Sequence, residues 1–437
     1  MKNPRVSKDF EYVPFCMACV LALILAMACL SKKNSHPDEF VHVRAAEYYH
    51  DHWIPPKVCA SDTEHTYSPH GISRLNTHEI FYFFAGKFSR LLSFVSMDDE
   101  YLKCRLLNVL LFFVLLLFCI KNLHYRILFL TILASPQIWY VFSYFNTDAF
   151  AMFVLLMISY QLLYKNSMLN NFLEGIGTQR SLFYGLIQGS LFSLLFFIKK
   201  NFFIFIIFVL LYFMLSLFKK DFSNPKMAVK RAFLIMLIAA SIFGLRYSLD
   251  IYINGFNKSN KILECQERFA RKDLKPSTNL ENKYFGVKLK NRGVTIKQMF
   301  GRYGWGEISF QSTFGVYGYM SIYPSKLYIQ IVKMITALFS IYIMYFFLFK
   351  MGLEENILLL IVFVCSFVLV GLALWHSWTV DLQRQGRYFL PIFVIIGFLL
   401  FQAERHLNHK ITNIFIIAMF LMSSYSFVFI GLSRITK

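Results

Sequence analysis

The sequence predicts an all-α polytopic integral membrane protein that forms a single domain over residues 1–437. The first observation behind this prediction is composition: 57% of the 437 residues are hydrophobic and phenylalanine alone occurs 50 times, whereas soluble domains contain ~45–50% apolar residues. The second is a mean hydropathy of +0.50. The third is that the apolar residues gather in runs of roughly 18–22, each long enough to cross a ~30 Å hydrocarbon core as a helix.

The expected architecture is a bundle of about eleven transmembrane helices with two long loops. In chain order the predicted spans cover residues 13–31, 106–120, 127–143, 147–164, 181–198, 202–218, 232–253, 326–349, 357–375, 388–403 and 411–433. The stretches 32–105 and 254–325 are too polar to lie in the membrane. They are therefore the two long loops, and the other connections are short.

The distribution of positive charge predicts the orientation. The chain has a net charge of +20, and residues 219–231 carry five basic side chains, which is typical of a cytoplasmic loop. Both long loops then lie on the opposite face, together with residues 146–148, 199–200 and 376–387. We expect a multi-pass membrane protein whose two long loops lie on the side opposite the cytoplasm. The remaining positive charge suits membrane lipids and phosphates, and no nucleic-acid-binding motif is present.

The first long loop opens with a short amphipathic segment that follows the first apolar run. Ser35 is expected to cap a helix there, with Asp38 in its first turn. Asp38 and His42 then share one helix face, and Glu39 lies beside them. Carboxylates near a helix N-terminus also complement the helix dipole, which is the structural alternative. In this position they can equally deprotonate a hydroxyl.

Further polar residues lie at the expected outer membrane boundary. Asp148 opens the span 147–164, and either it or Asn146 caps that helix. Lys199 and Lys200 separate two spans, and Arg387 begins another. Boundary cations of this kind either snorkel to headgroups or hold a phosphate, for which arginine is well suited.

The second long loop contains an aromatic, glycine-rich stretch. Arg302 and Trp305 lie in it, and it is either an interfacial aromatic turn or a surface on which a sugar stacks. Cys59 and Cys265 fall in different long loops. They are candidates for a disulfide that the sequence alone leaves open.

Three short motifs carry a family resemblance. They are Pro-Asp-Glu at 37–39 followed by His, Ala and Tyr at helical spacing, Pro136 followed by Asn-Thr-Asp at 146–148, and Gln-Gly-Arg-Tyr-Phe-Leu-Pro at 385–391. Together they resemble the GT-C superfamily of polyprenyl-phosphate-dependent glycosyltransferases. The chain length and the two long outer loops are similar to phage-type glucosyltransferases that convert the serotype of O-antigen.

The resemblance implies an enzyme that moves a sugar, expected to be glucose, from undecaprenyl phosphate to a hydroxyl of O-antigen, the glycan of lipopolysaccharide, or of another cell-surface glycan. It implies Asp38 as the catalytic base with Glu39 beside it. The residues at the outer face that we expect to bind the substrates are His42, Asp148, Lys199, Lys200, Arg302, Trp305, Arg387 and Tyr388. The resemblance further implies that this face is the periplasmic side of a bacterial inner membrane. The partners are the lipid-linked donor, the glycan acceptor and membrane lipids. Some relatives use a divalent metal, but no metal-ligand triad stands out, so no cofactor is expected.

The rival interpretation is a transporter or flippase of lipid-linked saccharides, with a polymerase of such saccharides as a further alternative. A transporter is expected to carry charged residues within its spans along the transport path. Here the predicted spans are nearly free of charge, and Arg246 and Asp250 are the main exceptions. The sequence therefore favours chemistry at one face of the membrane.

Overall fold

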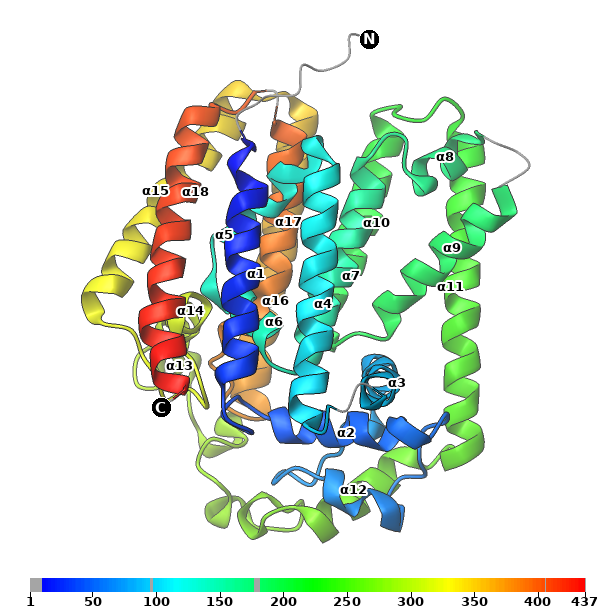
Figure 1. Cartoon of the computed structure of the whole chain (residues 1–437), viewed down its shortest axis with the longest axis vertical. Coiled ribbons are helices and arrows are strands. Elements are labelled where there is room, and N and C mark those ends of the chain that lie inside the picture. Colours follow the sequence, from blue (N-terminus) through cyan, green and yellow to red (C-terminus); the bar gives the residue numbers. More distant parts are fainter. Residues whose placement is uncertain (1–9, 95–96, 177–180, 405, 437) are drawn as a thin grey trace.

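The computed structural model describes residues 10–94, 97–176, 181–404 and 406–436. Every regular element in these residues is helical, as Figure 1 shows. Eight helices are long and apolar enough to cross a membrane, or up to ten if each of two bent helix pairs counts as one span. The predicted all-α polytopic class is confirmed, and the number of eleven spans stays a prediction.

Eight candidate spans meet the criteria of length and hydropathy on their own. Three of them include a flanking 3₁₀ or π turn. Their helices are α1 (Tyr12–Leu30), α4 (Glu100–Lys121), α10 (Ile204–Phe218) preceded by η7 (Lys200–Phe203), α11 (Pro225–Asn254), α15 (Lys326–Lys350), α16 (Leu353–Thr379), α17 (Leu390–Ala403) preceded by η11 (Gly386–Phe389), and α18 (His409–Tyr425) continued by η12 (Ser426–Leu432) and α19 (Ser433–Ile435).

The predicted span 127–143 is broken in the structure. Its first part is formed by η4 (Leu123–Phe129) and α5 (Leu130–Leu133), and its second part by α6 (Pro136–Ser143). The two parts are bent by 88°. Pro136 explains the break, because proline has no N–H to donate and its ring clashes with the preceding helical turn.

The predicted span 181–198 contains a shorter apolar helix. Here α9 (Ser181–Ser193) is followed by η6 (Leu194–Phe196). The span predicted over 147–164 corresponds to α7 (Thr147–Leu163), which is bent by 43° against α8 (Met168–Glu174). In these two regions and in the broken span, no single straight helix among the described residues is long and apolar enough to cross a membrane on its own.

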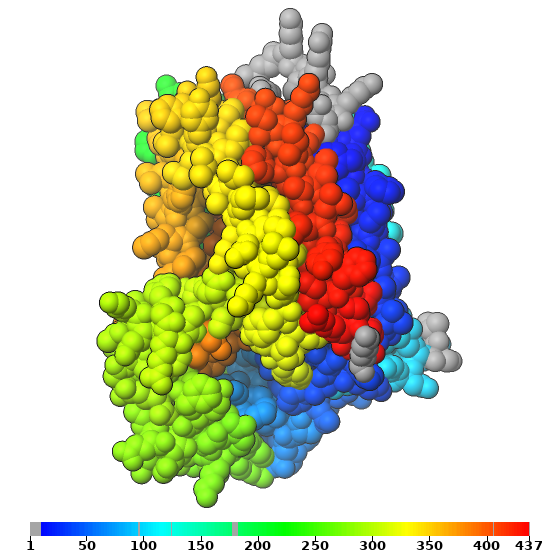
Figure 2. All heavy atoms as spheres, turned by 90° about the vertical axis from the view of Figure 1, so that its left-hand side faces the viewer, coloured from blue at the N-terminus to red at the C-terminus, as the bar shows by residue number. Residues whose placement is uncertain are grey.

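The two long loops form a layer at one end of the bundle, the lower end in Figure 1. Figure 2 shows much of the second loop, in green, gathered there below α16 and beside the lower end of α15. The layer contains α2 (Glu39–Asp51), η2 (Ser61–Thr66), η3 (Arg74–Asn76), α3 (Phe81–Ser93), α12 (Lys258–Phe269), η8 (Lys272–Leu274), η9 (Leu280–Asn282), η10 (Leu289–Arg292), α13 (Ile296–Phe300) and α14 (Trp305–Gly315).

A disulfide joins the two long loops within this layer. Cys59 and Cys265 are bonded, with their Cα atoms 5.8 Å apart. The pairing that the sequence left open is therefore present. Because a cross-link between distant residues restricts the unfolded chain most, this bond favours the association of the two loops.

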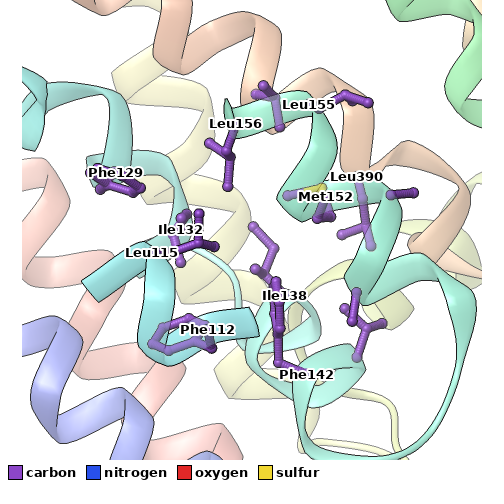
Figure 3. Packing of buried hydrophobic residues seen from close by; sticks show 14 of the residues in the cluster. Phe112, Leu115, Phe129, Ile132, Ile138, Phe142, Met152, Leu155, Leu156 and Leu390 are labelled. Atoms are coloured by element: carbon purple, nitrogen blue, oxygen red, sulfur yellow. The ribbon is translucent and has the colours of Figure 1, made fainter. Parts of the chain in front are cut away.

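The core lies between α4, the broken helix, α7 and α17. Figure 3 shows buried side chains from these helices in contact, among them Phe112, Ile138, Phe142 and Leu390. Lipid tails are as apolar as these residues, so van der Waals packing rather than hydrophobic burial stabilises such contacts in a membrane. By contrast α11 lies at one side of the bundle, and only 17% of its apolar window is buried.

Candidate functional site

Asp38, the predicted base, lies at the start of α2. The helix begins at Glu39, so Asp38 takes the N-cap position. The predicted cap by Ser35 is wrong, because its hydroxyl donates to the carbonyl of Lys32 at 2.9 Å. Asp38 has φ 58° and its side chain caps no helix N–H. This left-handed conformation is unfavourable for most residues but is tolerated by Asp and Asn. The Asp38 side chain is 46% exposed, so its carboxylate is accessible.

Glu39 is fully buried and held by Arg105 of α4. The guanidinium donates from Nε to Oε1 at 2.8 Å and from Nη2 to Oε2 at 2.7 Å. The backbone N–H of Phe145 donates to Oε1 at 3.1 Å. The remaining Arg105 N–H groups donate to the carbonyls of Ala28, Ser31 and Lys32. Both oxygens of Glu39 are thus engaged. We assign Glu39 a structural role that fixes α2 against α1, α4 and the segment before α7, and Asp38 remains the single candidate base.

Replacing Arg105 by methionine should destabilise the protein by about 3–5 kcal/mol, because it leaves the Glu39 carboxylate buried and unpaired. Thermal unfolding of the purified protein in detergent measures the change. The matched control is Arg268→Met, which removes an exposed pair with Glu64 and should change stability by no more than about 1 kcal/mol. Equal stability of the two variants would contradict the structural role of Glu39.

Arg387 reaches Asp38 from a position 349 residues later in the chain. Its Nη2 lies 3.4 Å from Oδ2 of Asp38, and its Nη1 lies 3.4 Å from the hydroxyl of Tyr144. Both contacts are longer than the ~2.7–2.9 Å of a strong charge-assisted hydrogen bond. Arg387 is buried, and its Nε has no partner among the described residues. The guanidinium therefore keeps unused donor capacity beside the candidate base.

The backbone next to Arg387 packs tightly against α14. A Cβ on Gly386 would lie 2.2 Å from the backbone nitrogen of Thr313. The Gly386 N–H also donates to the hydroxyl of Ser312 at 3.0 Å. Glycine is thus required for η11 to approach α14 and to set the position of Arg387.

Asp148 and Lys199 form a second ion pair beside this contact. Nζ of Lys199 lies 2.8 Å from Oδ2 of Asp148, and their side chains are 12% and 0% exposed. The cap of α7 is Asn146, whose side chain accepts from the N–H groups of Asp148 and Ala149 at 2.9 and 3.2 Å. The sequence left open whether Asn146 or Asp148 caps α7, and the structure shows that Asn146 does. The side chain of Asp148 therefore does not serve as the cap. Its second oxygen, Oδ1, is buried without a partner among the described residues.

His42 lies fully buried among the cations of this region. Its Nδ1 is 2.7 Å from the hydroxyl of Tyr82. Burial lowers the pKa of His42 well below its usual value, and three positive charges lower that pKa further. These charges belong to Arg74, Lys199 and Arg387. His42 is therefore neutral at pH 7, and the three cations converge from η3, the segment before η7, and η11.

Arg74, Glu79 and Arg105 are charged residues of this region that were not predicted from the sequence. Burial would lower the pKa of Arg74, but nearby groups that include Glu79 and Asp38 raise it above its usual value. Arg74 lies in a long polar loop with no periodicity, so no sequence signal marks it. Arg105 immediately precedes a predicted span. A charged residue at a membrane boundary needs a partner, and this requirement could have identified Arg105 from the sequence.

We call Asp38, Arg74, Asp148, Lys199 and Arg387 the central cluster. A cavity of about 10 Å³ opens beside it, between Gln137, Tyr140, Tyr144 and Arg387. This volume suits one water molecule or hydroxyl group. Gln137 is buried, and its Oε1 accepts no hydrogen bond from the described residues. The cavity thus brings an unused acceptor, Gln137, and the unused Nε donor of Arg387 to the same place.

The second long loop contributes less than the sequence suggested. Trp305 is a core residue, and its Nε1 donates to Oγ of Ser377 at 2.9 Å and to the carbonyl of Gln383 at 3.1 Å. With a 2% exposed side chain it has no open face for sugar stacking, which corrects the expected substrate role. Arg302 is exposed and lies over the ring of Tyr303 at 5.8 Å, and no contact joins it to the central cluster.

Two further predicted residues flank the central cluster. The ring of Tyr388 lies 5.8 Å from the guanidinium carbon of Arg387, and its hydroxyl donates to Oε1 of Gln383 at 3.3 Å. Lys200 is exposed, unlike its neighbour Lys199. The predicted lysine pair therefore does not act as one unit.

Among the described residues, no group of three or more His, Cys, Asp or Glu side chains is arranged to hold a metal ion. Comparisons with protein families, with curated proteins and with solved structures gave no match to this chain.

Proposed function

We propose that the chain is a membrane glycosyltransferase that moves a sugar from a polyprenyl phosphate to a hydroxyl of a cell-surface glycan. The observation that carries this proposal is the meeting of Asp38 and Arg387 at one end of the bundle. An accessible carboxylate in a left-handed turn lies against a buried guanidinium with unused donors. Unusual backbone conformations of this kind gather at functional sites.

The two residues supply the two functions that glycosyl transfer needs. The Asp38 carboxylate accepts the proton of the acceptor hydroxyl as its oxygen bonds to the anomeric carbon of the donor. The bond from that carbon to the phosphate oxygen breaks, and its electron pair stays on the lipid phosphate. This is a single displacement, so the anomeric configuration inverts. Atoms and charge balance without an oxidant or a reductant.

The cations of the central cluster fit the leaving group. As the sugar–phosphate bond breaks, negative charge grows on the phosphate, and preorganised donors stabilise that charge more than they stabilise the bound donor. Arg387 offers an unused donor for this purpose. Lys199 and Arg74 act electrostatically at the same place. Asp148 pairs with Lys199 and so holds its ammonium group in position.

We further propose that this end of the bundle faces the periplasm of a bacterial inner membrane. The basic short loop 219–231 lies at the opposite end, and basic short loops are typically cytoplasmic. The disulfide between the two long loops supports the same orientation, because disulfides persist outside the reducing cytosol.

Transfer from a defined donor tests the proposal. Purified protein is incubated with polyprenyl-phosphate glucose labelled in the sugar, and with lipopolysaccharide that carries O-antigen. We expect label in the glycan, and none when a nucleotide sugar replaces the lipid donor. In reconstituted vesicles, movement of a lipid-linked saccharide across the bilayer without any label transfer would contradict the proposal and favour a transporter.

A further inference from the structure

A second group of charged side chains lies where α11 meets the loop layer. It is separate from the central cluster. The members of this lateral cluster are Lys200 in η7, His78 in the loop before α3, Arg246 and Asp250 in α11, and Lys258 in α12. The ring centroid of His78 lies 6.0 Å from that of Phe243 and 5.9 Å from that of Tyr247, both on α11. Burial lowers the pKa of His78, and the three cations of the cluster lower that pKa further against the effect of the carboxylate. These four charges therefore all act on the side chain of His78.

Arg246 is the member that has a buried donor without a partner among the described residues. Asp250, one turn later on α11, is occupied by Lys258, whose Nζ lies 2.9 and 2.8 Å from its two oxygens. Asn254 donates to the same carboxylate at 3.0 Å. Within the described residues Arg246 forms no ion pair, and its buried Nη1 has no hydrogen-bond partner. A guanidinium inside a membrane span with an unused buried donor indicates a missing acceptor.

The charge and the location of the lateral cluster define this acceptor. Lys200, Arg246 and Lys258 supply three positive charges, and Asp250 supplies one negative charge, so an excess of positive charge remains for an anion. Arg246 and Asp250 belong to α11, and only 17% of the apolar window of this helix is buried, so we expect α11 to face lipid. Arg and Lys at a membrane boundary are well suited to phosphate. We propose that the lateral cluster binds the phosphate group of an anionic lipid or of another phosphate ester at this boundary.

The lateral site is distinct from the proposed donor site. Lys199 pairs with Asp148 in the central cluster, whereas Lys200 acts on His78 in the lateral cluster. Two consecutive lysines thus belong to two different sites. Because binding at the lateral cluster requires no transfer reaction, the proposal goes beyond the proposed function. A negative result for phosphate binding at the lateral cluster would not contradict the proposed sugar transfer, and a negative result for transfer would not contradict phosphate binding.

Ligand binding to the purified full chain in a neutral detergent tests this site. Phosphatidylglycerol, phosphatidylcholine and inorganic phosphate are titrated separately, with bound ligand counted by native mass spectrometry and stabilisation followed by thermal unfolding. Arg246→Gln should weaken the binding of phosphatidylglycerol or of inorganic phosphate, whichever of them binds, by about tenfold. The reason is that the substitution removes a charge-assisted hydrogen bond to the phosphate. Lys230→Gln is the matched control, since Lys230 is exposed and lies near the other end of α11. It should bind like the wild type.

Two outcomes support the site and identify the source of the phosphate. Arg246-dependent binding of phosphatidylglycerol without binding of inorganic phosphate identifies a lipid headgroup, and Arg246-dependent binding of inorganic phosphate alone identifies a free phosphate. Lys200→Gln provides a second variant at an exposed position should Arg246→Gln fail to fold. Equal binding by the wild type and both variants would overturn the proposal, and so would the absence of binding by phosphatidylglycerol and inorganic phosphate alike.

Discussion

Replacing Asp38 by asparagine should reduce sugar transfer by roughly 10²–10⁴-fold, the usual contribution of a general base. The substitution should leave the backbone unchanged, because asparagine tolerates the left-handed conformation that Asp38 adopts with φ 58°. Asp38 caps no helix N–H, so the fold loses no hydrogen bond within α2. The change therefore removes the proton acceptor and leaves the backbone as it is. Transfer per mole of purified, monodisperse protein is the measurement.

The matched control for this variant is Asp51→Asn on the same helix. The Asp51 side chain is 72% exposed at the other end of α2, so transfer should stay at the level of the wild type. Wild-type transfer by Asp38→Asn would remove Asp38 from the mechanism and leave no candidate base in the central cluster with an accessible carboxylate.

Replacing Arg387 by alanine should lower transfer by roughly 10²–10³-fold, the effect of removing one donor that stabilises charge in a transition state. Arg387→Lys should recover only part of this loss. A lysine ammonium supplies the charge, but it lacks the planar fork that binds two phosphate oxygens at once. In the structure the guanidinium makes two contacts of 3.4 Å and keeps Nε unused, which suits a residue that binds tightly only when substrate is present.

A structural arginine would behave differently from a catalytic one. Loss of a structural residue lowers the amount of folded protein, whereas specific activity of the folded fraction stays normal. Arg434→Ala serves as the control, because Arg434 is exposed and its Nη1 donates to the carbonyl of Tyr323 at a long distance of 3.5 Å. Undiminished specific activity in Arg387→Ala would assign the leaving-group role to Lys199 and Arg74 instead.

Adjacent residues mark the limit of what the sequence predicted in the candidate site. Asp38 and Glu39 look equivalent in the sequence, yet one is accessible and the other is buried against Arg105. Lys199 and Lys200 divide in the same way between the central and lateral clusters. Asp38 and Lys199 each directly precede a helical element, whereas Glu39 and Lys200 begin one. The surrounding helices therefore decide which residue of each pair reaches a given site.

The sequence by itself determined the membrane class, the positions of the polar segments and most of the charged residues at the candidate site. Hydropathy is a local property that each run of residues carries, so it needs no knowledge of neighbouring helices. The tertiary structure alone decided the break at Pro136, the meeting of Asp38 with Arg387, and the inclusion of Arg74. The contact between Asp38 and Arg387 joins segments that are 349 residues apart in the chain. No local sequence pattern indicates which distant segments the bundle brings together.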